Sequence, residues 1–331
     1  MPAPTPDRYR QGVTGEIIGH ASVIATAGLT KHYGTVHALT DLTVTVGDGV
    51  TGLVGANGAG KSTLIKILLG LLEPTSGQAS VLGHDIEQAS QEIRRLVGYM
   101  PEHDCLPPDV SASDFVVHMA RMSGLGASSA RERAADVLRH VGLEEERYRP
   151  MGGYSTGMKQ RAKLAQALVH DPRLVFLDEP TNGLDPAARN DMLALVQRIG
   201  SEFGIAVLVT SHLLGELEQV SDHVIVLDGG HLLRSSATGE FLERTGSLLV
   251  EVIGTATERD RLGEALALAG LACRPRGTMV AVDPPPPELA GGTAAYDIIR
   301  DVAADLGLGL MRLQPDRRHL EDVFLDGAAH V

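Results

Sequence analysis

The segment VTGLVGANGAGKSTLIKILLGLL, residues 50–72, decides the fold because it combines three structural signals in one continuous stretch. An apolar run comes first, a glycine-rich stretch follows it, and a longer apolar pattern closes the segment. Gly70 stands near the end of that last pattern, where glycine commonly terminates a helix. The segment therefore predicts a strand, a loop and a helix, in that order.

The predicted loop, residues 55–63, fits the pattern G-x-x-x-x-G-K-[ST], which is typical of loops that bind nucleotide phosphates. Its glycines let successive backbone N–H groups wrap around β- and γ-phosphates more closely than a Cβ would allow. Lys61 would add a positive charge, and the Ser62 hydroxyl is placed to bind Mg²⁺. A flexible glycine-rich turn without a ligand is the alternative, but it does not explain the flanking strand and helix. The residues expected to bind the nucleotide here are Gly55, Asn57, Gly58, Gly60, Lys61, Ser62 and Thr63.

A second apolar run, LVFLDEP at residues 174–180, ends in two carboxylates. Short continuous apolar runs are typical of parallel strands that are buried on both faces. At the carboxyl end of such a strand, Asp178 is expected near the metal and Glu179 is expected to act as general base toward a water molecule. Alternatively, the two carboxylates only cap the following turn; the phosphate loop upstream disfavours that interpretation.

Two further candidates are a histidine and an aromatic residue. His212 ends the apolar run VLVTSH and is expected on the ligand side of an open α/β sheet, where it would contact the γ-phosphate and hold the water and the base in line. A structural histidine with satisfied hydrogen bonds is the alternative. A single aromatic residue is more often part of a core, but Tyr33 precedes the phosphate loop and, together with the other motifs, is expected to stack on adenine.

The stretch YSTGMKQR, residues 154–161, runs directly into a helical pattern. Ser155 is a favourable N-cap, and the small residues beside it leave the first backbone N–H groups of the helix open. Such a helix start binds anions, because the donors and the positive end of the helix dipole face outward. The stretch therefore predicts an anion site separate in sequence from the phosphate loop.

Composition limits the class of protein. The 331 residues are 43% hydrophobic and 21% charged, which is ordinary for a soluble globular protein of one or two domains. The net charge of −13 and the lack of a local basic cluster argue against a nucleic-acid partner. Residues 1–22 are expected to form a flexible tail and not a secretion signal, and no apolar run is long enough to cross a bilayer. Cys105 and Cys273 fit no metal-ligand spacing and are expected to be free thiols.

Taken in order, the phosphate loop, YSTGMKQR, LDEP, TNGLD and the strand-end histidine resemble the ATP-binding subunits of ABC transporters, over about residues 23–240. The resemblance implies an α/β fold: a P-loop NTPase core of ABC type, with a mixed sheet, an antiparallel β subdomain and a helical subdomain at about residues 100–165. It also implies a head-to-tail dimer that sandwiches ATP between two subunits. Ser155 and Gly157 would then contact the γ-phosphate held by the neighbouring subunit, and Asp185 would run across the interface.

The sequence departs from the family pattern in places. Thr156 and Met158 replace the usual glycine and glutamine of the signature, and Ala56 replaces a proline of the phosphate loop. VGYMPEHDCL, residues 97–106, resembles the Q-loop, but Glu102 stands where a glutamine is usual. A carboxylate is also a hard oxygen ligand, so the expected Mg²⁺ ligands are Ser62, Asp178 and Glu102.

Residues 241–331 change in character. Their pattern predicts the order β-α-β-β-α-β, a small C-terminal α+β module, and HLEDVFL at residues 319–325 resembles the ATPase subunits of bacterial ABC-2 type exporters of drugs and antibiotics. That resemblance implies an ATPase that binds ATP and Mg²⁺, pairs with a second copy or a homologous subunit, and powers a separate transmembrane permease from the cytoplasmic face of the membrane. The alternative is a soluble ABC-type ATPase that serves assembly or remodelling away from the membrane.

Overall fold

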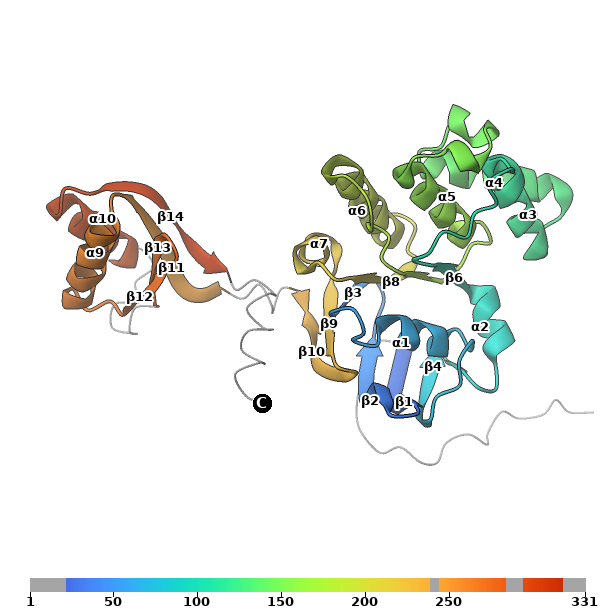
Figure 1. The fold of residues 1–331 in the computed structure, drawn as a ribbon, viewed down its shortest axis with the longest axis horizontal. Helices are drawn as coiled ribbons and strands as arrows, with labels where there is room; N and C mark the ends of the chain where they lie inside the picture. Colours follow the sequence, from blue (N-terminus) through green and yellow to red (C-terminus); the bar gives the residue numbers. More distant parts are fainter. Residues whose placement is uncertain (1–21, 239–243, 284–293, 318–331) are drawn as a thin grey trace, which may run out of the picture.

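The computed structural model describes residues 22–238, 244–283 and 294–317. The predicted N-terminal tail, apart from Ser22, and the segment HLEDVFL lie outside the described residues. The predicted division between residues 240 and 241 falls within 239–243, also outside them, so the exact domain boundaries stay a prediction. The fold class is confirmed: an α/β core with a mixed sheet, an antiparallel sheet and a helical layer is joined by a smaller α+β unit (Figure 1).

The central sheet has six strands in the order β10-β9-β3-β8-β7-β6. All neighbours from β9 to β6 are parallel, and β10 pairs with β9 as an antiparallel hairpin. Every residue of β3, β7 and β8 is buried, which explains why these strands are continuous apolar runs in the sequence. The strand bounds are β3 Val50–Val54, β6 Val97–Met100, β7 Leu174–Leu177, β8 Ala206–Ser211, β9 His223–Asp228 and β10 His231–Ala237.

A four-stranded antiparallel sheet, in the order β2-β1-β4-β5, lies against one side of the core (Figure 1). One hydrophobic cluster joins Leu29 and Leu42 of this sheet to Ile65 of α1 and Phe176 of the central sheet. Helix α1 is therefore fixed between the two sheets, directly after the glycine-rich loop. The elements are β1 Ile24–Tyr33, β2 Val36–Val46, α1 Lys61–Leu68, β4 Ser76–Val81 and β5 His84–Asp85.

The helical layer covers the other side of the central sheet, and its core contains many alanines that allow close helix packing, among them Ala120, Ala134 and Ala165. The Ser155 side chain caps α5, and the Asp185 side chain caps α6. Each accepts a hydrogen bond from the backbone N–H group three residues further on. None of the helices within the described ranges is both long and apolar enough to span a bilayer. The helices of this layer are α3 Ala112–Met122, α4 Ala127–His140, α5 Thr156–Leu168, α6 Pro186–Ser201 and α7 Leu214–Val220. Helix α2, Ser90–Leu96, instead packs through Ile93 in the cluster shared with the antiparallel sheet.

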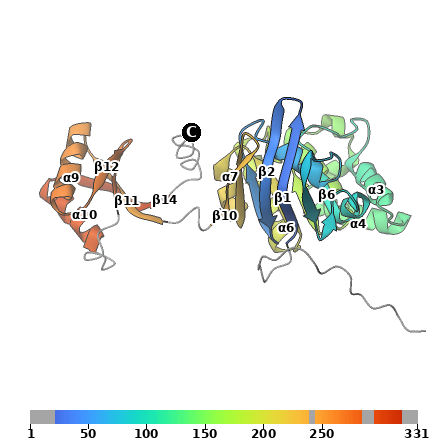
Figure 2. The same cartoon turned by 90° about the horizontal axis from the view of Figure 1, so that it is seen from below.

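The C-terminal unit is a four-stranded antiparallel sheet in the order β12-β13-β11-β14, with two helices on one side (Figure 2). Val250, Leu262 and Ile299 form part of a core that is separate from those of the larger α/β unit. The element order β-α-β-β-α-β is the one expected, and the strand order is that of ferredoxin-like folds. Cys105 and Cys273 are free, as expected. The elements are β11 Arg244–Ile253, α9 Ala256–Leu268, β12 Cys273–Arg276, β13 Met279–Val282, α10 Ala294–Asp305 and β14 Gly309–Arg317.

One histidine links the helical layer to the edge of the central sheet. His170 follows α5, and its Nε2 lies 3.2 Å from the carbonyl oxygen of Val97 in β6. Burial lowers the pKa of His170 below its ordinary value of 6.5, because the charged imidazolium loses its hydration. The unfolded chain therefore binds a proton more readily than the folded chain. This contribution to the free energy of unfolding is present above pH 6.5 and is lost as the pH falls through the lowered folded pKa.

We expect His170→Gln to flatten the dependence of stability on pH between about pH 7 and pH 5, because glutamine keeps an N–H donor and cannot titrate. Urea denaturation at a series of pH values measures the effect. His118→Gln, on the exposed side of α3, is the matched control and should retain the wild-type slope. An unaltered slope in the His170 variant would contradict the assignment.

Candidate functional site

The loop between β3 and α1 brings its backbone unusually close to its neighbours. A Cβ on Gly55 would lie 2.5 Å from the carbonyl oxygen of Leu227, and one on Gly60 would lie 2.4 Å from that of Ala38. Gly60 also has a φ of 103°, in the left-handed region that favours glycine. The glycines are therefore required by close packing, and the result is a loop whose backbone is open to a ligand.

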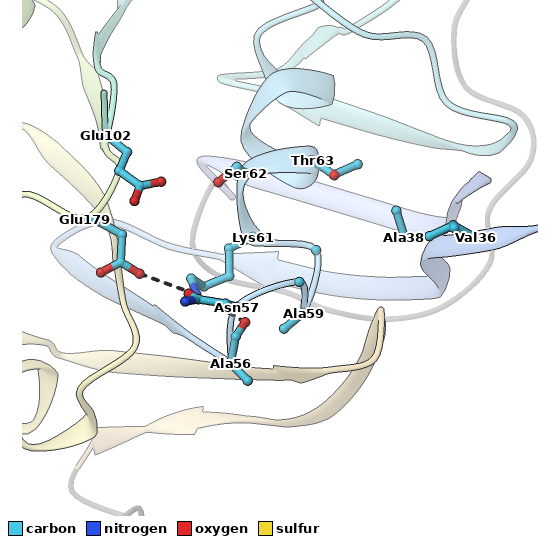
Figure 3. Close-up of a pocket in the computed structure, with 12 residues that line it drawn as sticks. Val36, Ala38, Ala56, Asn57, Ala59, Lys61, Ser62, Thr63, Glu102 and Glu179 are labelled. Atoms are coloured by element: carbon cyan, nitrogen blue, oxygen red, sulfur yellow. Dashed lines mark hydrogen bonds and ion pairs between the residues drawn. The ribbon is translucent and has the colours of Figure 1, made fainter. Parts of the chain in front are cut away.

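A pocket of about 370 Å³ opens over this loop (Figure 3). It combines the loop with two residues of β2 and with two carboxylates from other parts of the chain. Most of the residues predicted to bind a nucleotide are thus gathered around one cavity. Its lining is Val36, Ala38, Ala56, Asn57, Gly58, Ala59, Gly60, Lys61, Ser62, Thr63, Glu102 and Glu179.

Lys61 and Glu179 face each other across this pocket. The Lys61 ammonium donates a hydrogen bond to the Gly55 carbonyl oxygen at 2.6 Å and lies 3.4 Å from Glu179 Oε1 (Figure 3). Both side chains are only 7% exposed. The contact with Oε1 is an ion pair without hydrogen-bond geometry, so this buried oxygen has no hydrogen-bond donor. A water molecule or another donor placed in the pocket would satisfy it.

Glu179 is held in place from the adjacent strand β8. Its Oε2 lies 2.8 Å from Nδ1 of His212, and its backbone N–H donates to the Thr210 hydroxyl at 2.8 Å. The φ of Glu179 is 49°, a strained value for a residue with a side chain. Such a conformation persists only when neighbouring contacts fix it, and here His212 and Thr210 supply them. His212 is 45% exposed and can reach a ligand as well as the carboxylate.

Two of the three predicted metal ligands, Ser62 and Glu102, line the pocket, and the third, Asp178, contacts Ser62. Ser62 Oγ donates to Asp178 Oδ1 at 3.5 Å, and Asp178 is buried. Glu102 reaches the pocket from the segment after β6, and its Oε1 accepts a hydrogen bond from Asn182 Nδ2 at 3.3 Å. A hydroxyl and two carboxylates are the hard oxygen donors that Mg²⁺ prefers, so these residues fit the ion.

Seven predicted site residues are not part of the pocket lining. Three of them, Gly55, Asp178 and His212, contact residues that do line it. The other four are Tyr33, Ser155, Gly157 and Asp185. Tyr33 is 48% exposed, and the Lys31 ammonium lies 5.3 Å from the centroid of its ring. Val36 and Ala38 form the wall of the pocket on that side. Ser155, Gly157 and Asp185 lie elsewhere, at the starts of α5 and α6.

These two helix starts are neighbours. A Cβ on Gly157 would lie 3.6 Å from Cβ of Ala188, and one on Gly183 would lie 3.5 Å from Cγ2 of Thr156. Ser155 and Asp185 are both exposed. The anion site predicted at YSTGMKQR and Asp185 of the segment TNGLD thus belong to neighbouring helix starts, and Ser155, Gly157 and Asp185 are not among the residues that line the pocket of the same chain.

The sequence interpretation did not single out several residues that organise the site. Thr210 donates to Asp178 Oδ1 at 2.8 Å and so links the two carboxylates. Glu216 is buried, and its Oε2 accepts hydrogen bonds from Thr181 at 2.7 Å and Ser211 at 3.1 Å. Its Oε1 lies 3.0 Å from Nε of Arg189 in α6. The signal for Thr210 is a hydroxyl at the end of a buried strand, which must find a polar partner; Glu216 has no such signal.

We expect Thr210→Val to lower the free energy of unfolding by about 1–3 kcal/mol, because the backbone N–H of Glu179 loses its acceptor and Asp178 loses a donor, both in a buried site. Thr210→Ser keeps the hydroxyl and is the control. Denaturation in urea compares the two variants. Equal stability of the valine and serine variants would show that the hydroxyl does not link the carboxylates.

Comparison with known proteins gives relatives of one kind. A family model described as ABC transporter matches residues 39–182. The bacitracin transport ATP-binding protein BcrA of Bacillus licheniformis is 39% identical over 214 residues, which are 64% of this chain and 69% of that protein. The daunorubicin/doxorubicin resistance ATP-binding protein DrrA of Streptomyces peucetius is 38% identical over 225 residues, 68% of each chain. An uncharacterised ABC transporter ATP-binding protein of Bacillus subtilis, YxlF, is 34% identical over 276 residues, 82% of this chain and 88% of that one.

Solved structures agree with these relatives. The structure of cbiO1 from Clostridium perfringens, part of the ABC transporter complex cbiONQ, has a TM-score of 0.62 and 28% identity, and the match covers 66% of this chain and 90% of that one. The ATP-binding cassette MJ0796 bound to ADP and Pi has a TM-score of 0.60 over 65% of this chain and 98% of its own, and at 22% identity it supports the fold alone. With the phosphate loop, the strand-end carboxylates and these relatives in agreement, the chain belongs to the ABC transporter family, as an ATP-binding subunit and an ATPase.

Proposed function

We propose that this ATPase powers an exporter through ATP-driven closure of a head-to-tail dimer. The division of the site within one chain is the main support. The pocket holds the phosphate loop and Glu179, whereas Ser155, Gly157 and Asp185 stand on a separate, partly exposed surface. An ATP molecule in the pocket of one copy would therefore meet the helix start of another copy. The N-terminus of α5 favours the negative charge of a γ-phosphate at that place.

Within each site, the residues have distinct roles. Lys61 binds phosphate oxygens, and Glu179 accepts a proton from the attacking water through Oε1, which has no hydrogen-bond donor within the chain. His212 fixes the other oxygen of that carboxylate and is exposed enough to contact the γ-phosphate. Ser62, Asp178 and Glu102 would hold Mg²⁺, which supplies positive charge to the phosphates. Tyr33 remains a candidate for stacking on adenine.

Closure and reopening follow from charge. Two ATP molecules carry negative charge that is fully compensated only when the two half-sites meet, so ATP stabilises the closed dimer. Hydrolysis removes this stabilisation, and the dimer reopens. The difference in affinity between the closed and the open state can drive a second protein that has two conformations.

The names of the relatives favour export as the use of this cycle. They include bacitracin transport, daunorubicin/doxorubicin resistance and Nod factor export. We therefore assign to this chain a separate transmembrane permease as partner and a peripheral position on the cytoplasmic face of the membrane. The soluble remodelling ATPase considered above has no such support among these relatives.

The segment after β6 is the candidate surface for the permease. It runs from Glu102 to Phe115, and Asp109 within it is exposed. Asp104 is exposed too, but its Oδ2 accepts from Lys159 Nζ at 2.6 Å. Charge reversal at Asp104 would therefore disturb the chain itself, and Asp109 is the better position for a test.

We expect Glu179→Gln to form a stable dimer with saturating Mg-ATP and to hydrolyse ATP very slowly, because the amide cannot accept the proton from water. Light scattering after size-exclusion chromatography measures the mass, with ADP as the control nucleotide. Lys61→Ala in the same background should remain monomeric. A Glu179→Gln protein that is monomeric at every concentration of Mg-ATP would refute the proposed head-to-tail dimer with ATP between the two copies.

We expect Asp109→Lys to reduce the share of the protein that sediments with native membranes, while the ATPase rate of the purified protein stays at the wild-type value. The reason is that the substitution reverses the charge of an exposed docking residue away from the pocket. Asp48→Lys, in the exposed turn between β2 and β3, is the matched control. Equal sedimentation of both variants would remove this segment as the docking surface.

A further inference from the structure

A buried lysine of α5 holds the segment that carries Glu102. Lys163 is 3% exposed. Its ammonium donates to three successive carbonyl oxygens, those of Pro101 at 2.8 Å, Glu102 at 2.9 Å and His103 at 3.4 Å. An ammonium has three N–H donors, so its full hydrogen-bonding capacity is directed at this one segment.

Burial of a lysine is costly, and the surroundings of Lys163 oppose that cost. Desolvation lowers the pKa of Lys163, while Cys105, Asp104, Glu102 and Asp178 raise it. The three carbonyl oxygens replace the water that the ammonium loses. A residue with only a packing role would not need a charge here, since an apolar side chain of the same length fills the space at less cost.

A second route connects α5 to the side chain of Glu102. Gln160, one turn before Lys163, is buried and donates through Nε2 to the carbonyl oxygen of Asn182 at 3.3 Å. Asn182 in turn donates to Glu102 Oε1 at 3.3 Å. Both the backbone and the carboxylate of Glu102 are thus fixed by consecutive turns of one helix. The ion pair between Lys159 and Asp104 lies nearer the surface, where such pairs contribute little.

We propose that Lys163 is a positioning residue for Glu102: it couples the orientation of α5 to the carboxylate in the nucleotide pocket. Helix α5 starts at the surface that we assign to the nucleotide of the neighbouring copy. Lys163 lies about 10 Å further along the helix axis, at 1.5 Å per residue. A rigid helix that shifts when its start binds a γ-phosphate carries Lys163, and with it the backbone of Glu102, in the same motion.

The proposal rests on the proposed function in one respect, the placement of Glu102 beside Mg-ATP. Its test is a double-mutant cycle on the Mg²⁺ concentration that gives half the maximal ATPase rate. Lys163→Met removes the charge and keeps the unbranched stem. We expect it to raise this concentration about tenfold, the usual effect of losing a partner of a metal ligand. In a Glu102→Ala background, Lys163→Met should change it by less than about twofold.

Lys159→Met is the matched control, because it removes a lysine from the same helix without touching the three carbonyls. It should leave the half-maximal Mg²⁺ concentration within about twofold of wild type. Thermal unfolding without nucleotide reports any general loss of stability. If Lys163→Met does not fold, Lys163→Gln, which keeps N–H donors without charge, enters the same cycle with the same expected direction.

Two results would overturn the proposal. One is a Lys163 variant with wild-type Mg²⁺ dependence. The other is an equal change in the presence and absence of the Glu102 carboxylate, which would mean that Lys163 acts on the fold alone. Failure of the proposed ATP-closed dimer is detected by a separate experiment, the light-scattering mass of the Glu179→Gln protein with Mg-ATP. The two ideas can therefore fail independently.

Discussion

Burial of charge at the carboxyl ends of β3, β7 and β8 is the constraint on which the rest of the structure depends. Lys61, Asp178 and Glu179 are each less than 10% exposed. Removing an ionised group from water is expensive unless partners replace its hydration. The chain supplies these partners from every neighbouring element: a carbonyl oxygen of the phosphate loop, the hydroxyl of Thr210 and the ring of His212. The order of the strands in the central sheet places these groups at one edge.

The parts of the fold that the sequence predicted are those set by local patterns. Buried parallel strands are continuous apolar runs, and the phosphate loop needs glycine at fixed spacing, so β3, β7, β8 and α1 could be assigned with their order. The antiparallel strands of the C-terminal unit follow from alternation and from turns. Ser155 was recognisable because an N-cap acts within three residues of itself, whereas Asp185 was singled out only by resemblance and its capping of α6 is a finding of the structure. The sequence motifs also identified most of the residues that line the nucleotide pocket.

The rest depends on distant neighbours. Lys163 stands in a pattern where lysine is normally exposed, and only the approach of the segment after β6 shows that it is buried. Glu216 joins residues from three elements, and Thr210 joins two carboxylates that follow a different strand. Tyr33 precedes the phosphate loop in sequence, but Val36 and Ala38 of the neighbouring strand β2 form the pocket wall from this sheet, so stacking of Tyr33 on adenine stays a prediction. Sequence spacing cannot decide such cases, because each is settled by tertiary packing.

The ion pair between Lys61 and Glu179 links the binding of phosphate to the availability of the catalytic base. The ammonium that would bind phosphate is paired with the carboxylate that would deprotonate water. A phosphate group that binds Lys61 has to displace the Glu179 carboxylate from the ammonium. Only then is the carboxylate free to accept a proton from water. Binding of phosphate to Lys61 and release of the Glu179 carboxylate for proton transfer are therefore coupled.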